Sequence, residues 1–301
     1  MRTLIVPRWR MPSPYQPFLT LDAGGEPLCQ LKLSYVLYLD YPPGPKRAGR
    51  VVEAYMARFG QHVREYQPTS WLGPAWKWDP AARSAFPGRL AELQKTVDWG
   101  YGFGDGTLVN NHLFMFHGYK PVTESGKASF FRFEWPWDTA ADVVAPFVKE
   151  VADLVPFLSG NAGYILSTRP FDPEAHDHMY AVARRYWGIE AWNLDSTVKY
   201  VLEGYKCPTW LTLIGDRLLE KISTRGTLET ALHLATRCAT GTIFRTRQEP
   251  AFIDRNRVEN YDNEKRVAEA LLPLQIRTHE PFGGTRWTPE TTLEWLYRFT
   301  T

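Results

Sequence analysis

Apolar and polar side chains alternate over residues 29–41, with leucine or tyrosine at every second position from Leu31 to Leu39. A period of two is typical of a half-buried strand, and the proline-rich run at residues 42–45 ends it. Beyond this turn, apolar residues recur every three or four positions, which predicts an amphipathic helix that Pro68 closes. The predicted inner face of this helix consists of Val51, Tyr55, Phe59, Val63 and Tyr66.

The same order of patterns returns about a hundred residues later. Alternation over residues 131–135 predicts a second strand, and residues 136–138 predict a turn. The helical stripe that follows consists of Val143, Phe147, Val151 and Leu154, and an edge strand is predicted after it at residues 163–166. We interpret the two segments as related strand-turn-helix units.

The remaining patterns complete an α+β fold. Residues 112–116 and 130–135 are typical of two paired hairpin strands, and further strands are predicted at residues 209–214 and 241–245. Val267 and Leu271 share one face of a late helix, and Thr288 followed by proline is typical of a helix start. The sequence therefore predicts antiparallel sheets with helices packed outside, built from two related strand-turn-helix units plus a C-terminal strand-helix portion.

Three segments are expected along the chain. Residues 1–27 are rich in proline and predict an extended N-terminal arm. Residues 28–170 hold the first α+β unit pair with its internal repeat. Residues 171–301 form a C-terminal α+β portion, either separate or as one continuous domain with the preceding part.

Length and charge narrow the classes of function. A chain of 301 residues with 44% hydrophobic content can bury a large core. Its formal charge of +2 gives no general attraction to nucleic acid, to an anionic membrane or to a polyanionic substrate. The chain also lacks the surplus negative charge with which a protein could imitate DNA.

The apolar runs, the N-terminus and the cysteines of the sequence suggest a cytoplasmic protein without a metal or cofactor. No apolar run approaches the roughly 20 residues that cross a bilayer, and proline and arginine interrupt the first ten residues before a signal-peptide core could form. Cys29, Cys207 and Cys238 are scattered and form no Cys-x-x-Cys pair, so buried free thiols are expected.

A distinctive motif lies at residues 208–222. A buried apolar run at 210–214 ends at Gly215, and Asp216 can cap the helical pattern that follows. This aromatic-Leu-Thr-Leu-Ile-Gly run, preceded by the Gly-Ile-Glu loop at residues 188–190, resembles the TsiV-like family of bacterial type VI secretion immunity proteins. The resemblance extends to the strand and helix of residues 31–66, to residues 130–166, and to the Asp-Arg-Asn-Arg run at 254–257 with its following helix.

The resemblance implies a function that the residues alone do not. It implies an immunity protein that binds and neutralises a cognate type VI secretion toxin, a VRR-Nuc or related nuclease effector, by occluding its active site or locking an inactive state. It also implies no turnover of a substrate by this chain. We expect no enzyme activity, no cofactor, and no direct contact with nucleic acid or membrane. The resemblance further implies that residues 254–257 are a fold element, with Asp254 capping or pairing locally.

A metal-assisted hydrolase is one alternative that the sequence leaves open. Asp172, His176 and His178 form a cluster with the ligand types that divalent cations accept. On a helix beginning at Pro173, however, positions 176 and 178 point about 200° apart. Histidines near a helix start are therefore the favoured interpretation, and no metal site is predicted.

A nucleic-acid-binding protein is the other alternative. Arg245, Arg247, Arg255 and Arg257 make the most basic short region, and they could contact a phosphate backbone. The carboxylates at positions 249 and 254 alternate with these cations, which favours a salt-bridged surface instead.

The loop at residues 186–195 is the predicted partner-binding site. It brings aromatic residues and carboxylates together around Gly188, and aromatic anchors dominate the energy of many interfaces. The acidic groups could meet the basic or metal-bearing cleft of a nuclease. The alternative is that Trp187 and Ile189 are buried and fix the loop. The predicted contact residues are Trp187, Glu190, Trp192 and Asp195.

Overall fold

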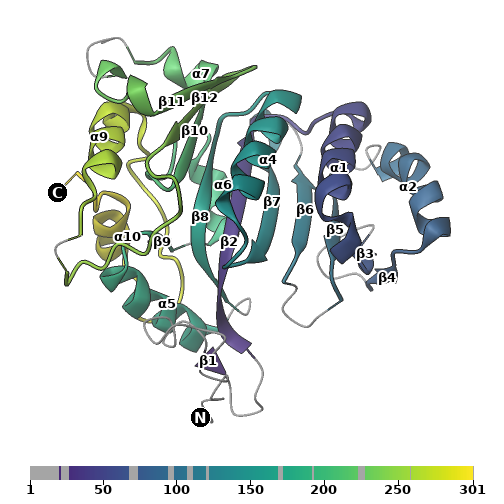
Figure 1. Cartoon of the computed structure of the whole chain (residues 1–301), viewed down its shortest axis with the longest axis horizontal. Coiled ribbons are helices and arrows are strands. Elements are labelled where there is room, and N and C mark those ends of the chain that lie inside the picture. The colour runs from purple at the N-terminus through teal and green to yellow at the C-terminus, as the bar shows by residue number, and fades with distance from the viewer. Residues whose placement is uncertain are drawn as a thin grey trace.

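The computed structural model describes residues 20–21, 27–67, 74–93, 98–106, 111–119, 122–168, 172–191, 193–222, 228–257 and 259–300. A single twisted sheet forms the centre of this part of the protein (Figure 1). Its main path runs in the order β11-β12-β10-β8-β2-β7-β6-β5-β3-β4, with β1 beside β2 and β9 beside β8. The pairing of β8 with β9 is parallel, and the other described pairs are antiparallel.

The described strands have the following bounds: β1 Thr20–Leu21, β2 Pro27–Leu39, β3 Glu65–Gln67, β4 Trp76–Lys77, β5 Trp99–Gly104, β6 Leu113–Gly118, β7 Ser129–Pro136, β8 Ser159–Thr168, β9 Ile189–Glu190, β10 Leu211–Gly215, β11 Ala235–Cys238 and β12 Gly241–Arg245. The helices are α1 Pro45–Phe59, α2 Pro80–Leu93, α3 Val122–Ser125, α4 Ala141–Leu154, α5 Pro173–Arg185, α6 Leu194–Tyr200, α7 Asp216–Leu219, α9 Asp262–Leu271 and α10 Pro289–Leu296. Short 3₁₀ turns lie at Gly60–His62, Leu232–Leu234 and Leu272–Leu274.

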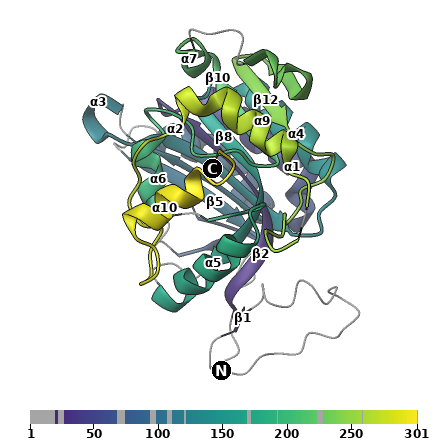
Figure 2. The same cartoon turned by 90° about the vertical axis from the view of Figure 1, so that its left-hand side faces the viewer.

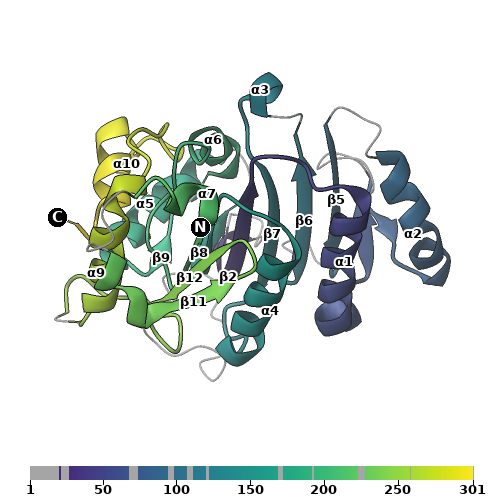
Figure 3. The same ribbon diagram turned by 90° about the horizontal axis from the view of Figure 1, so that it is seen from above.

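Helices cover both faces of the sheet (Figure 3). The long helices of the two related units, α1 and α4, pack side by side on one face. On the other face, Val36 and Tyr38 of β2 pack against Leu194 and Val198 of α6. Strand β2 is buried on both faces, so the prediction of a half-buried strand was wrong. It pairs with β7 on one side and with β8 on the other over most of its length.

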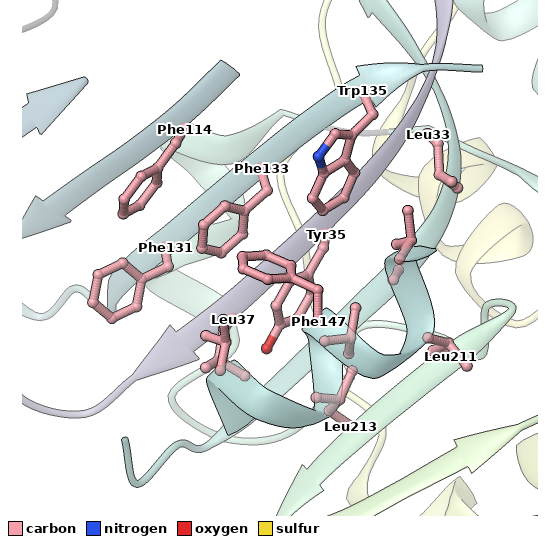
Figure 4. Close-up of a cluster of buried hydrophobic side chains, with 14 of the residues drawn as sticks. Leu33, Tyr35, Leu37, Phe114, Phe131, Phe133, Trp135, Phe147, Leu211 and Leu213 are labelled. Atoms are coloured by element: carbon pink, nitrogen blue, oxygen red, sulfur yellow. The ribbon is translucent and has the colours of Figure 1, made fainter. Parts of the chain in front are cut away.

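The core beneath α1 and α4 is rich in aromatic side chains (Figure 4). Phe147 of α4 meets Phe133 of β7 edge to face, with ring centroids 5.0 Å apart. Tyr35 of β2 stacks on the opposite strand's Phe133 at 5.4 Å. Edge-to-face and stacked rings attract each other beyond the area that they bury, so this cluster fixes the two units on one sheet.

The structure confirms the predicted α+β class, with antiparallel sheet and helices outside. The two related units are β2 with α1 and β7 with α4, and the predicted hairpin partners are β6 and β7. The late helices also form as predicted, and Thr288 caps α10 by accepting a hydrogen bond from the Thr291 amide at 3.2 Å. All three cysteines are free and buried.

Three other local predictions were wrong. The first helix ends at Phe59 and passes into the 3₁₀ turn Gly60–His62, and Tyr66 belongs instead to β3, where its side chain is buried. The strand predicted at an edge, β8, lies inside the sheet between β2 and β10. On α4, Val143 is 42% exposed, and the inner face is formed by Val144 together with Phe147 and Val151.

One sheet contains strands from both sides of the boundary that the sequence predicts near residue 170. Strand β8 pairs with both β10 and β9, which follow it in the C-terminal portion. Most of the predicted N-terminal arm lies outside the described residues, although Thr20–Leu21 pairs with β2. No helix in the described part of the chain combines the length and apolar character needed to cross a bilayer.

Candidate partner-binding surface

Two loops far apart in sequence hold each other at the end of the molecule that carries α5, α9, α10 and the C-terminus (Figure 2). The amides of Trp187 and Gly188 donate to the carbonyls of Ile253 and Phe252 at 3.0 and 2.8 Å. The amide of Arg255 donates back to the Arg185 carbonyl at 2.8 Å. We call residues 185–188 and 251–257 the loop clamp. It contains Gly188 of the Gly-Ile-Glu motif and the whole Asp-Arg-Asn-Arg run, which lie before and after β10 in sequence.

The loop clamp is tightly packed and locally strained. A Cβ atom on Gly188 would overlap the carbonyl oxygen of Ala251, so the close approach of the two backbones requires glycine. Ile253 has a φ of 54°, a left-handed conformation that is unusual for a β-branched residue. Its buried side chain packs against Ala268 and Phe299, and this packing holds the strained backbone in place.

Asp254 is the electrostatic centre of the loop clamp. Its carboxylate accepts hydrogen bonds from Arg185 Nε at 3.2 Å and Nη2 at 2.9 Å, and from the Asn256 amide at 3.0 Å. The Arg185 hydrogen bonds are the main reason why the pKa of Asp254 lies below its usual value. The local pairing of Asp254 that the family resemblance implies is thus present.

The outer side of the loop clamp carries exposed arginines next to an aromatic ring. The guanidinium of Arg255 lies 5.5 Å from the ring centre of Trp187. Arg257 has 70% of its side chain exposed, and its Nε lies 3.8 Å from Asp254. Trp187 itself is half-buried against Tyr261 and Phe299, so it supports the surface from below.

The other two arginines of the basic region are bound within the protein. Arg245 donates to the carbonyl of Arg247 at 3.0 Å and to that of Gln248. Arg247 donates to the buried carboxylate of Glu264 at 2.6 Å. Of the four arginines in this region, Arg255 and Arg257 are therefore the two that are directed to the surface.

The four predicted contact residues do not share one exposed surface. Glu190 is 3% exposed and pairs with Lys206, 2.6 Å away, while the Asn161 amide donates to the same carboxylate. Asp195 is exposed on the first turn of α6, Trp187 is half-buried, and Trp192 lies outside the described residues. Their part in partner binding stays a prediction, but the expected exposure of Glu190 was wrong because Lys206 supplies a buried counter-charge.

Lys206 is a residue that the sequence patterns did not single out. Its ammonium also donates to the Ala191 carbonyl at 2.7 Å and lies 5.0 Å from the ring centre of Phe282. The sequence shows a lone lysine between Tyr205 and Cys207, in a segment without other charges, and this pattern could have indicated a buried ion pair. The pair links β9 to the segment before β10.

The residues of the hypothetical metal site have structural contacts. Asp172 caps α5 by accepting from the amides of Glu174 and Ala175 at 3.0 and 3.2 Å. His176 packs against the turn at Gly283, where an added Cβ would lie 2.8 Å from the imidazole Nδ1. Among the residues that the structure describes, no three His, Cys, Asp or Glu side chains gather in a way that could hold a metal ion.

Comparison with known proteins decides the family. Residues 50–299 match the family described as type VI immunity for VRR-NUC, TsiV, which covers well over half of the chain. The chain belongs to the TsiV family. A similar solved structure, the Pseudomonas aeruginosa T6SS protein PA0821, superposes with a TM-score of 0.75 over 93% of this chain and 85% of that protein. Because the two sequences are only 15% identical, this likeness shows a shared fold. No curated protein matches the sequence of this TsiV-family chain.

Proposed function

We propose that this TsiV-family chain acts in the cytoplasm, where it binds and neutralises a VRR-Nuc-type nuclease toxin of the type VI secretion system. The observation that carries the proposal is the family match over residues 50–299. The chain acts by binding, without turnover of a substrate. It either covers the active site of the toxin or holds the toxin in an inactive state.

The charge of the chain supports these two mechanisms over imitation of DNA. A DNA mimic needs a dense acidic face, whereas this chain has a formal charge of +2 and places arginines on the loop clamp. Shape and a few desolvated anchors must then supply the affinity. In such a complex the chain itself covers part of the toxin surface.

Co-expression with the toxin encoded beside the gene of this chain tests the proposal. We expect growth to be rescued, and we expect the two proteins to copurify as a stable complex. A catalytically inactive toxin, which needs no rescue but should still copurify, is the control that separates binding from toxicity. A folded chain that neither rescues growth nor copurifies would overturn the proposal.

A DNA-binding assay on the complex separates the two mechanisms. If the chain covers the active site, a saturating amount should abolish both DNA binding and DNA cleavage by the toxin. If it locks an inactive state, cleavage should stop while DNA binding persists. Titration of nuclease activity at fixed toxin concentration should reach its end point at a simple molar ratio, because an inhibitor that binds tightly is consumed stoichiometrically.

A further inference from the structure

We propose that the outer side of the loop clamp, formed by Arg255 over the ring of Trp187 and by Arg257 beside Asp254, is the surface that meets the toxin, and that it docks on an acidic patch of the toxin protein. This inference rests on the proposed function. It names the contact surface and the chemistry of the partner, and neither follows from membership of the family.

The first argument is rigidity. The backbones of the two loops are joined by three hydrogen bonds, and Asp254 ties Arg185 to the amide of Asn256. Strained backbone such as that of Ile253 persists only where the surroundings over-determine it, and such positions cluster at functional sites. A preorganised surface loses little conformational entropy on binding, which favours tight inhibition.

The second argument is charge. Arg185, Arg255 and Arg257 contribute three positive charges, whereas the neighbouring carboxylates are those of Asp254 and Glu259. Asp254 is shared between Arg185 and Arg257, and Glu259 accepts from the backbone amide of Asp254 at 3.0 Å. Neither carboxylate forms a described ion pair with Arg255, so this cation is available to a partner.

The third argument is side-chain chemistry. Tryptophan and arginine are the residue types that most often carry binding energy at protein interfaces. A guanidinium that lies over an aromatic ring keeps its N–H donors free at its edge, and these donors match the two oxygens of a carboxylate. The geometry therefore suits Asp or Glu side chains of a protein partner.

A protein suits this surface better than nucleic acid does. Binding along a phosphate backbone usually requires several cations in a row, yet Arg245 and Arg247 are bound internally. The carboxylates of Asp254 and Glu259 would also lie close to any phosphate that reached Arg257. Isolated carboxylates of a folded toxin can approach the two arginines individually.

The experiment measures the affinity of the purified chain for the catalytically inactive toxin encoded beside its gene. We expect Arg255→Glu/Arg257→Glu to weaken binding about 100-fold, because two attractive contacts become repulsive. Arg255→Lys should weaken it about tenfold, since lysine keeps the charge but loses the planar fork. The loop clamp itself should survive, because its backbone hydrogen bonds do not involve these side chains.

The matched control is Arg50→Glu/Arg83→Glu, which makes the same change in charge on exposed residues of α1 and α2, at the opposite end of the sheet (Figure 1). We expect its affinity to stay within about threefold of wild type, since distant exposed charges are screened by salt. Equal weakening by both double variants would reduce the effect to net charge and overturn the proposal.

The remaining outcomes separate the surface from the function. If the wild-type chain binds the toxin and the folded Arg255→Glu/Arg257→Glu variant binds it equally well, the surface is wrong while the immunity function stands. If the wild-type chain does not bind the toxin at all, the proposed function fails first. Salt-sensitive retention of duplex DNA that the double variant abolishes would make this a nucleic-acid surface and overturn the protein partner. Should the double variant fail to fold, Arg255→Glu alone gives the same comparison.

Discussion

At the scale of single residues, Gly188 controls how closely the two loops of the loop clamp approach. A methyl group at this position would overlap the carbonyl oxygen of Ala251. We expect Gly188→Ala to lower the free energy of unfolding by about 2–4 kcal/mol, because the backbones must separate. Urea denaturation measures the change.

Gly163→Ala is the matched control for this substitution. An added Cβ on Gly163 would meet its nearest neighbours, in Thr209 and Trp210, at an ordinary contact distance of 3.7 Å. We expect a change within about 1 kcal/mol. Equal losses for the two variants would mean that the close approach at Gly188 is not what limits stability.

We expect His279 to make the stability of the fold depend on pH. Burial lowers its pKa to about 4, with Lys206 adding to the effect and Glu280 opposing it. Between the unfolded value near 6.5 and a pKa of about 4, the unfolded chain binds a proton that the folded chain does not. Stability contributed by the neutral imidazole is therefore present at pH 7 and is lost as the pH falls through this window.

We expect His279 to account for a loss on the order of 2 kcal/mol between pH 6.5 and 4. The measurement compares urea denaturation of wild type and His279→Gln across this range, and the variant should show the flatter curve. His233→Gln, at an exposed position, should follow the wild-type curve. Parallel curves for wild type and His279→Gln would remove His279 as the cause.

At the scale of elements, the buried pair of Glu190 and Lys206 joins β9 to the segment before β10. Removing one partner leaves the other charge buried without compensation, so we expect Lys206→Met or Glu190→Gln alone to cost about 3–5 kcal/mol. The double variant should cost clearly less than the sum. A double-mutant cycle by urea denaturation measures this coupling.

The exposed pair of Lys149 and Asp153 on α4 is the control for that cycle. Its coupling should be below about 0.5 kcal/mol, because water screens both groups. A similarly small coupling for Glu190 and Lys206 would show that the buried contact does not connect the two elements energetically.

At the scale of the whole molecule, the continuous sheet should make folding cooperative. Strand β8 belongs to the first portion of the chain and pairs with β9 and β10 of the second. We expect a single calorimetric transition with equal calorimetric and van't Hoff enthalpies. Two resolved transitions would instead indicate that residues 28–170 and 171–301 unfold as separate domains.

Much of the fold could be predicted because burial leaves a periodic trace in the local sequence. Strand β2 and helices α9 and α10 form where alternation, helical spacing and the Thr288 cap indicate. The end of α1 was missed because Val63 and Tyr66 are buried as well, so the apolar spacing continues past Gly60 into another element. Spacing alone cannot show that two buried residues belong to different elements.

The candidate site was predicted less completely, because the neighbours of a charged residue are set by distant parts of the chain. Glu190 looks like a surface carboxylate until Lys206 and Asn161 are placed beside it. The arginines at 245–257 look equivalent in sequence, yet Arg247 meets Glu264 whereas Arg255 lies over Trp187. These contacts join residues from separate elements.

The sequence by itself determined the α+β class, the repeated strand-turn-helix units and the family motifs, since these depend on local periodicity and short patterns. Only the tertiary structure decided that one sheet unites both portions, that Glu190 is buried, and that the loops around Trp187 and Asp254 form the loop clamp. The physical reason is that burial and charge pairing depend on which segments meet, and folding brings together residues that the chain keeps far apart.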